Sequence, residues 1–73
     1  MTQYTIVQRL SARDKAANGG EDLYLNHAYL HSCAFGSADM MWTTHDHEQA
    51  ASMLKRARKA NPDAPIGIEE LPQ

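Results

Sequence analysis

Apolar residues recur at helical spacing in the second half of the chain. Within residues 42–61, apolar side chains lie three and four positions apart, at Ala50, Met53, Leu54, Ala57 and Ala60. The other positions of this stretch carry mostly charged and polar side chains. This spacing gathers the apolar side chains on one face when about 3.6 residues make a turn. The pattern predicts an amphipathic helix of about four turns.

Residues that commonly begin and end helices flank this pattern. Thr43, Thr44 and Asp46 precede it, and each can accept a hydrogen bond from a free amide of the first turn. The sequence leaves all three open as the cap. Asn61 suits a left-handed C-terminal position, and Pro62 cannot continue a helix because it has no amide proton. We therefore expect the helix to end just before this pair.

A strand pattern follows the helix. Ile66 and Ile68 alternate with Gly67 and Glu69, which is the two-residue period of a strand with one buried face. A proline lies on each side of the stretch. Because proline donates no hydrogen bond to a neighbouring strand, the pattern predicts an edge or terminal strand over residues 65–70.

The first half of the chain begins with a second strand pattern. Residues 3–10 are rich in β-branched and aromatic side chains, and Tyr4, Ile6 and Leu10 fall on one face. Residues 11–22 are polar and contain two adjacent glycines, so we expect an exposed connection with a helical turn at its start. Connections of this length in small domains are often functional or mobile, which makes residues 11–22 a candidate contact loop.

Residues 23–35 fit two periods. Leu23 and Leu25 alternate with polar neighbours as in a strand, whereas Leu25, Ala28 and Tyr29 also share a helical face. We favour a strand, with His27 beginning a bulge, because turn residues bound the stretch. A short third strand is expected over residues 39–43, with Trp42 sealing the helix onto the sheet.

Together these elements predict one small α+β domain spanning residues 1–73. The order β-β-β-α-β implies a small antiparallel or mixed sheet with one amphipathic helix packed on one face. One helix is too small to cover all of the tyrosine, phenylalanine and methionine side chains. An uncovered apolar patch favours a homodimer or a protein partner.

Composition narrows the classes of function. The net charge of −2 creates no strong field for nucleic acid, and the chain has a single cysteine. No apolar run approaches the roughly 20 residues that span a bilayer, and the first ten residues lack the pattern of a secretion signal. We therefore expect a cytoplasmic protein with no membrane partner and no cofactor.

Candidate metal ligands are present without a diagnostic spacing. They are His27, His31, Cys33, His45 and His47. His27 and His31 share a face only on a helix, whereas His31 and Cys33 share one only on a strand, so the two pairings need different secondary structures. Ordinary histidines are the preferred interpretation, with a zinc-stabilised fold as an alternative. No catalytic constellation accompanies Cys33, so we expect no enzyme activity.

Basic and aromatic side chains supply the candidate binding residues. The basic residues toward the end of the helix, with those in residues 9–15, form a candidate phosphate-binding patch, which makes a nucleic-acid regulator the alternative function. Basic side chains are also expected there from the helix dipole alone, so a protein partner is preferred. The partner-binding candidates are Arg13, Lys15, Tyr24, Tyr29, Met41, Arg56, Arg58 and Lys59.

The second half of the chain also resembles a known class of small proteins. The resemblance rests on Trp42-Thr43-Thr44, Gln49-Ala50, Leu54 and residues 62–71, and on chain size. In these features the chain resembles accessory proteins of phages and mobile elements, of the anti-CRISPR and anti-defence kind. The resemblance implies a non-enzymatic inhibitor that binds and blocks a host defence complex. It carries no functional residue over to this chain.

Overall fold

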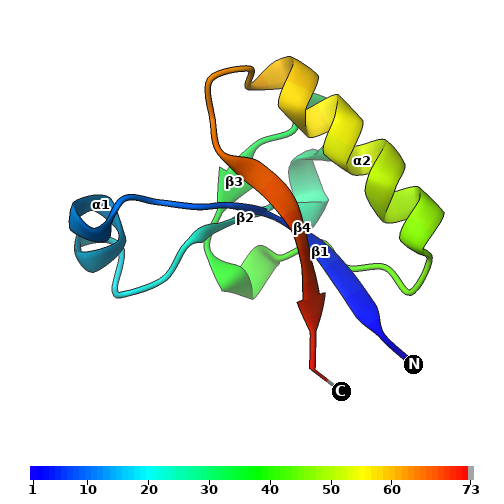
Figure 1. Ribbon diagram of the computed structural model, residues 1–73, viewed down its shortest axis with the longest axis horizontal. Helices are drawn as coiled ribbons and strands as arrows, with labels where there is room; N and C mark the ends of the chain where they lie inside the picture. Colours follow the sequence, from blue (N-terminus) through cyan, green and yellow to red (C-terminus); the bar gives the residue numbers. More distant parts are fainter. Residues whose placement is uncertain (73) are drawn as a thin grey trace.

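An antiparallel sheet of four strands carries one long helix on one face (Figure 1). The computed structural model describes residues 1–72. The strands lie in the order β3-β2-β1-β4, and the helix α2 packs against β1 and β4. The α+β class with a small sheet and one covering helix is confirmed, and the sheet is antiparallel. The elements are β1 Gln3–Gln8, α1 Ala12–Ala17, β2 Leu23–Leu25, β3 Phe35–Gly36, α2 His47–Ala60 and β4 Ile66–Leu71, with 3-10 helices η1 His27–Ser32 and η2 Ala38–Met40.

The structure identifies Asp46 as the residue that caps α2. Its Oδ1 accepts hydrogen bonds from the amides of Glu48 at 2.9 Å and Gln49 at 3.4 Å. Thr44 supports the cap, since its Oγ1 accepts the amide of Asp46 at 3.1 Å. The helix ends before Asn61, as expected from its sequence.

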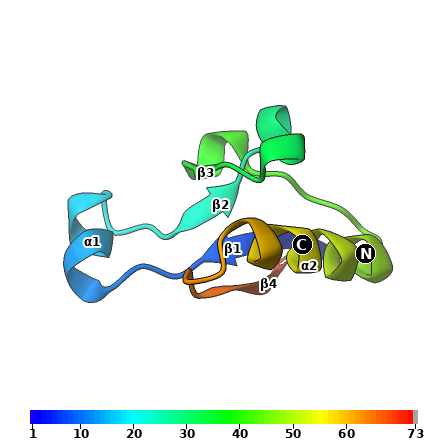
Figure 2. The ribbon, with the colours of Figure 1, turned by 90° about the horizontal axis from the view of Figure 1, so that it is seen from above.

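β4 is an edge strand, as its flanking prolines indicate. It pairs along its whole length with β1, from Gln3 opposite Leu71 to Gln8 opposite Ile66. β1 ends at Gln8, earlier than predicted. The connection that follows contains the six-residue helix α1. Seen from above, β4 is the outermost strand beside α2 (Figure 2).

The strand predicted over residues 23–35 is wrong for most of its length. Only Leu23–Leu25 and Phe35–Gly36 pair as strands, and η1 lies between them. Asn26 begins η1 because its side chain accepts the amide of Ala28 at 2.8 Å. The break in alternation after Asn26 is therefore a capped helix start and not a bulge. Cys33 ends the segment in the left-handed region, with φ 53°.

The strand predicted over residues 39–43 is also wrong. η2 occupies Ala38–Met40, and the following residues make only two isolated bridges, from Met41 to Asn26 and from Thr44 to Tyr4. β2 already pairs with the C-terminal end of β1, so the returning chain meets β1 only near its start.

The core lies between α2 and the sheet. Its buried residues are Ile6, Leu25, Cys33, Trp42, Met53, Ala57 and Ile66. Trp42 is 9% exposed and belongs to the same cluster as the helix residues, which confirms the packing role predicted for it. Ala50 and Ala57 are fully buried on α2, and these small side chains let the helix approach the sheet closely.

Candidate interaction surfaces

The sheet face away from α2 is covered by the chain's own polar side chains. Ile6 points to the helix, so its neighbours Thr5 and Val7 point the other way, and both are fully buried. Tyr24 on β2 pairs with Val7 on β1, so the two side chains lie next to each other on this face. Thr5 donates a hydrogen bond to the backbone carbonyl of Trp42 at 2.6 Å. This face therefore offers no open apolar patch at the centre of β1.

Asp22 organises the charges on this face. It is 5% exposed, its Oδ1 accepts the amide of Leu10 at 3.0 Å, and its Oδ2 lies 3.2 Å from Nη1 of Arg9. Nζ of Lys15 lies 3.6 Å from the same oxygen. The amide of Leu10, aided by these two cations, holds the pKa of the Asp22 carboxyl below its ordinary value despite burial. Lys15, a candidate contact residue, is therefore engaged within the chain.

Glu69 extends this network across the sheet. Its Oε1 lies 3.8 Å from Nη1 of Arg9, and its Oε2 is buried without a hydrogen-bond partner among residues 1–72. Burial, followed by the negative charge of Glu69, raises the pKa of the half-buried Tyr24 phenol. Tyr24 was a candidate contact residue from the sequence, and its place in the structure is within this covering layer.

The basic candidates fall into two separate groups. Arg13 lies on α1, which buries none of its residues and projects from the end of the sheet away from α2 (Figures 1 and 2). Arg56, Arg58 and Lys59 lie near the C-terminal end of α2. Two of them have contacts within the chain: Nη1 of Arg56 lies 3.7 Å from Sδ of Met53, and Nε of Arg58 donates to the carbonyl of Ile66 at 3.0 Å. The single patch considered from the sequence is therefore split.

The candidate metal ligands are not gathered into a site. Among residues 1–72, no group of three His, Cys, Asp or Glu side chains is placed to hold an ion. His27 and His31 are exposed on η1, and Cys33 is buried with its Sγ 3.5 Å from the carbonyl of Leu30. Nδ1 of His45 lies 3.1 Å from the carbonyl of Thr2. His47 packs edge-on against Tyr4, with ring centroids 5.1 Å apart.

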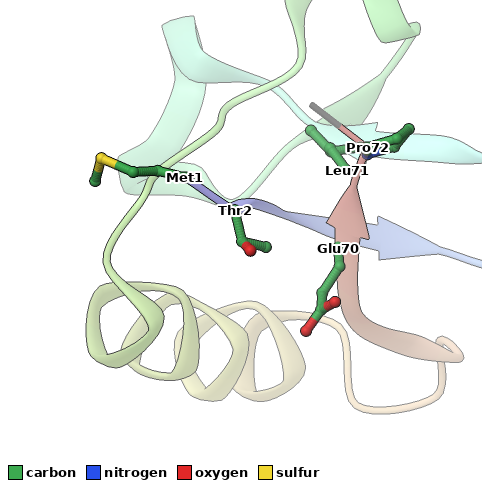
Figure 3. A pocket seen from close by; sticks show the side chains of 5 residues that line it. All are labelled: Met1, Thr2, Glu70, Leu71 and Pro72. Atoms are coloured by element: carbon green, nitrogen blue, oxygen red, sulfur yellow. The ribbon is translucent and has the colours of Figure 1, made fainter.

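A shallow hollow lies between the start of β1 and the end of β4 (Figure 3). It measures about 510 Å³ and is lined by Met1, Thr2, Glu70, Leu71 and Pro72. The side chain of Glu70 extends toward α2, whereas that of Met1 points away from the hollow. Among these described residues Glu70 has the only charged side chain, and the hollow is open to solvent, so it would bury little of the surface of a small molecule.

Tyr29 is the most exposed aromatic side chain, at 54%, and it lies on a well-fixed backbone. Its amide donates to the carbonyl of Asn26 at 3.1 Å, and its carbonyl accepts both the hydroxyl of Ser32 at 3.1 Å and the amide of Ala34 at 3.4 Å. The backbone of Tyr29 departs from helical angles, with φ −132° and ψ 40°, at a kink inside η1. The ring is therefore held out by a short segment that is hydrogen-bonded on both sides.

Met40 on η2 is the other large apolar side chain exposed in the segment between β2 and α2, at 38%. Its neighbour Met41, a sequence candidate, is half-buried and bridges to Asn26. We refer to the exposed parts of η1 and η2, which include Tyr29 and Met40, as the η surface. Sequence reasoning identified Tyr29 but not Met40, because the pattern of residues 39–43 was interpreted as a strand.

Asp22 is the residue at the centre of the charge network, and sequence reasoning missed this role. It was one of several scattered acids in a polar stretch, and no periodicity distinguishes it from Glu21 or Asp14. The available signal was its position directly before the first residue of β2, where a carboxylate can accept amides from the preceding strand end.

No helix within residues 1–72 is both long enough and apolar enough to cross a membrane.

Comparisons with known proteins assign no family to the chain. No protein-family model, curated protein or solved structure matches the chain.

Proposed function

We propose that this protein is a non-enzymatic binding protein that occupies a surface of a larger protein through its η surface. The observation that carries the proposal is the exposure of Tyr29 on a backbone segment fixed by its own hydrogen bonds. Following the resemblance of the sequence to anti-defence proteins, a host defence complex is the first class of partner to test.

The fixed backbone favours binding because little conformational entropy remains to be lost. Exposed tyrosine combines a large apolar ring with a hydroxyl and has few rotatable bonds, which makes it a frequent energetic centre of protein interfaces. Asn26 at the start of η1 and Cys33 at its end hold the segment in place from both sides. A partner would thus meet a Tyr29 ring that is already positioned.

The chemistry of the η surface suits a protein partner better than a nucleic acid. Its exposed groups include Tyr29, Met40 and the two η1 histidines, His27 and His31. None of these is a lysine or arginine, whereas phosphate recognition depends on such cations. The flexible side chain of a methionine such as Met40 adapts its shape to an apolar partner.

The dispersed reactive groups support a role without catalysis. Cys33 is buried, and within residues 1–72 no three His, Cys, Asp or Glu side chains are placed to hold a metal ion. A nucleophile needs a base within hydrogen-bond reach and an oriented third group, and Cys33 instead contacts the carbonyl of Leu30.

The proposal is tested by affinity capture of the tagged full chain from the cells that produce it, with the retained proteins quantified by mass spectrometry. We expect a stoichiometric partner whose recovery falls about tenfold or more with Tyr29→Ser, because truncating a central aromatic removes a large share of the binding free energy. Met40→Ser should weaken recovery less.

Arg13→Ser is the matched control, because Arg13 is exposed like Tyr29 but lies on α1, away from the η surface. It should retain the partner at the wild-type level, and the melting temperatures of all variants should agree. Equal recovery by the wild type and Tyr29→Ser, or no partner above the untagged background, would overturn the proposal.

A further inference from the structure

The outer edge of β4 has free backbone groups. Tyr4 exchanges backbone hydrogen bonds with Thr44, so its amide and carbonyl point away from β4. In an antiparallel pair these directions alternate, which assigns the β1 to β4 bonds to the pairs that include Thr5 with Glu69 and Val7 with Gly67. Ile68 and Glu70 therefore direct their amides and carbonyls outward, where residues 1–72 provide no backbone partner.

One flank of α2 lies along the same edge. Nε of Arg58 reaches over the edge to the outward carbonyl of Ile66. Leu54 and Ala51 precede Arg58 by four and seven residues, so they lie on the same flank of the helix. Leu54 and Ile68 are both half-buried and pack against the core cluster, and Ala51 is exposed. The edge thus combines free strand groups with an apolar strip and a cation.

We propose that a second copy of this chain occupies this edge. Its β4 pairs antiparallel with the first β4 about a two-fold axis at Ile68, and joins the two sheets into one. In this register Ile68 faces Ile68 and exchanges two backbone hydrogen bonds with it, and Glu70 of each copy faces Ile66 of the other. The amide of Ile66 already donates to the carbonyl of Ala64 at 3.0 Å, so at this pair only the carbonyl of Ile66, which also accepts Nε of Arg58, can receive the amide of Glu70. Glu69 then faces Gly67 of the second copy, where open space surrounds the place that a β-carbon would occupy, so the glutamate has room.

Charge complementarity selects this register. Glu70 of the second copy comes to lie opposite Ile66, whose carbonyl already holds Arg58, so each dimer contains two Arg58 to Glu70 pairs. Shifting the axis by one residue to Glu69 would instead set two Glu69 carboxylates side by side. The register centred on Ile68 avoids this repulsion.

The helices are also spaced to fit. α2 packs on both β1 and β4, so its axis lies about one strand spacing, roughly 4.8 Å, from the two-fold axis. Two such helices would stand about 10 Å apart, which is a normal distance for packed helices. Leu54 lies about 6 Å before Arg58 along α2, and Ile68 lies a similar distance beyond Ile66 along β4. The two copies of Leu54 therefore meet across the axis, next to the paired Ile68 residues.

The experiment measures the mass of the full chain by sedimentation equilibrium, for the wild type and for variants in which the charges of Arg58 and Glu70 are reversed singly and together. Glu70 is exposed, so Glu70→Arg should leave the fold intact and set arginines against each other across the axis. We expect a wild-type dimer whose dissociation constant rises about tenfold or more in Glu70→Arg and in Arg58→Glu. The double variant, with both substitutions, should recover most of this loss.

Two control variants show whether the effect is specific to the β4 edge. Glu48→Arg changes the same charge on an exposed position of the first turn of α2, and it should leave the dimer unchanged. Tyr29→Ser should also dimerise normally, which separates this inference from the proposed partner binding. A wild-type monomer at high concentration, a dimer insensitive to Glu70→Arg, or a double variant no better than the single ones would overturn the second copy as the occupant.

Discussion

Arg9 and Asp22 close the base of the connection that carries α1. Arg9 directly follows β1 and Asp22 directly precedes β2, and Nη1 of the arginine lies 3.2 Å from Oδ2 of the aspartate. The amide of Leu10 adds a second contact to the same carboxylate group at 3.0 Å. Residues 11–21 are exposed throughout, so this buried carboxylate is the main link between the connection and the sheet.

Asp22→Asn is expected to destabilise the protein at neutral pH, because it removes the charge that Arg9 and Lys15 face. The folded state lowers the pKa of Asp22 below 3.8, so the unfolded chain binds this proton more tightly. The stabilisation is therefore complete well above pH 3.8 and is lost as the pH falls through that value toward the lowered pKa. Urea unfolding of both proteins from neutral to acidic pH should show the difference in unfolding free energy shrinking in acid.

Asp63→Asn serves as the control for this prediction, since Asp63 is exposed in the turn after α2. It should unfold like the wild type at neutral pH. A constant difference between wild type and Asp22→Asn over the whole pH range would contradict the role assigned to the carboxylate.

The Tyr24 phenol should ionise later than an ordinary tyrosine. Burial and the charge of Glu69 raise its pKa above 10.0, so the folded state holds this proton more tightly than the unfolded chain. The associated stability is present below pH 10.0 and is lost as the pH rises through the raised pKa. Tyrosinate absorbance should show a late transition that Tyr24→Phe abolishes and Glu69→Gln moves to lower pH. Glu70→Gln, on the neighbouring exposed position, should leave it in place.

The contribution of the α2 cap to the free energy of unfolding can be measured with two substitutions at Asp46. Asp46→Ala removes the acceptor for the amides of Glu48 and Gln49 and should lower the free energy of unfolding by about 1 kcal/mol. Asp46→Asn keeps an acceptor oxygen and should cost only a few tenths of a kcal/mol, roughly. Chemical denaturation checks both, and equal losses in the two variants would show that charge and not hydrogen bonding dominates.

Ala57 sets the distance between α2 and the sheet. It is fully buried within the core cluster, so Ala57→Leu should lower the free energy of unfolding by about 1–3 kcal/mol through overpacking. Ala60→Leu introduces the same side chain at an exposed position of the same helix and should change it by less than about 0.5 kcal/mol. Similar effects of the two substitutions in thermal unfolding would mean that the helix does not pack as closely as described.

The sequence predicted best where a regular period and its end signals agreed. The apolar stripe with Asn61-Pro62 behind it located α2, and Ile66 and Ile68 located the edge strand β4. It failed between β2 and α2, where local hydrogen bonds decide the backbone. Asn26 can cap a helix or end a strand, and only the bond to the amide of Ala28 shows which occurs.

The candidate sites were harder to predict because they depend on which residues the fold brings together. Lys15 and Tyr24 were expected at a contact surface, but Asp22 and Glu69 engage them from other elements. Tyr29 stays exposed because η1 replaces the predicted strand. A period in the sequence cannot report such pairings, since it describes the faces of single elements and not which charges meet across a connection or between β2 and β4.

The most direct test of the binding role is photocrosslinking from position 29 in the cells that produce the protein. A photoreactive phenylalanine analogue replaces Tyr29 in one variant and Arg13 in another, and crosslinked products are identified after irradiation. We predict one defined heterologous partner attached through position 29 and none through position 13. Crosslinking from position 29 that yields no adduct, or the same adducts as position 13, would contradict the assignment of the η surface as the binding site.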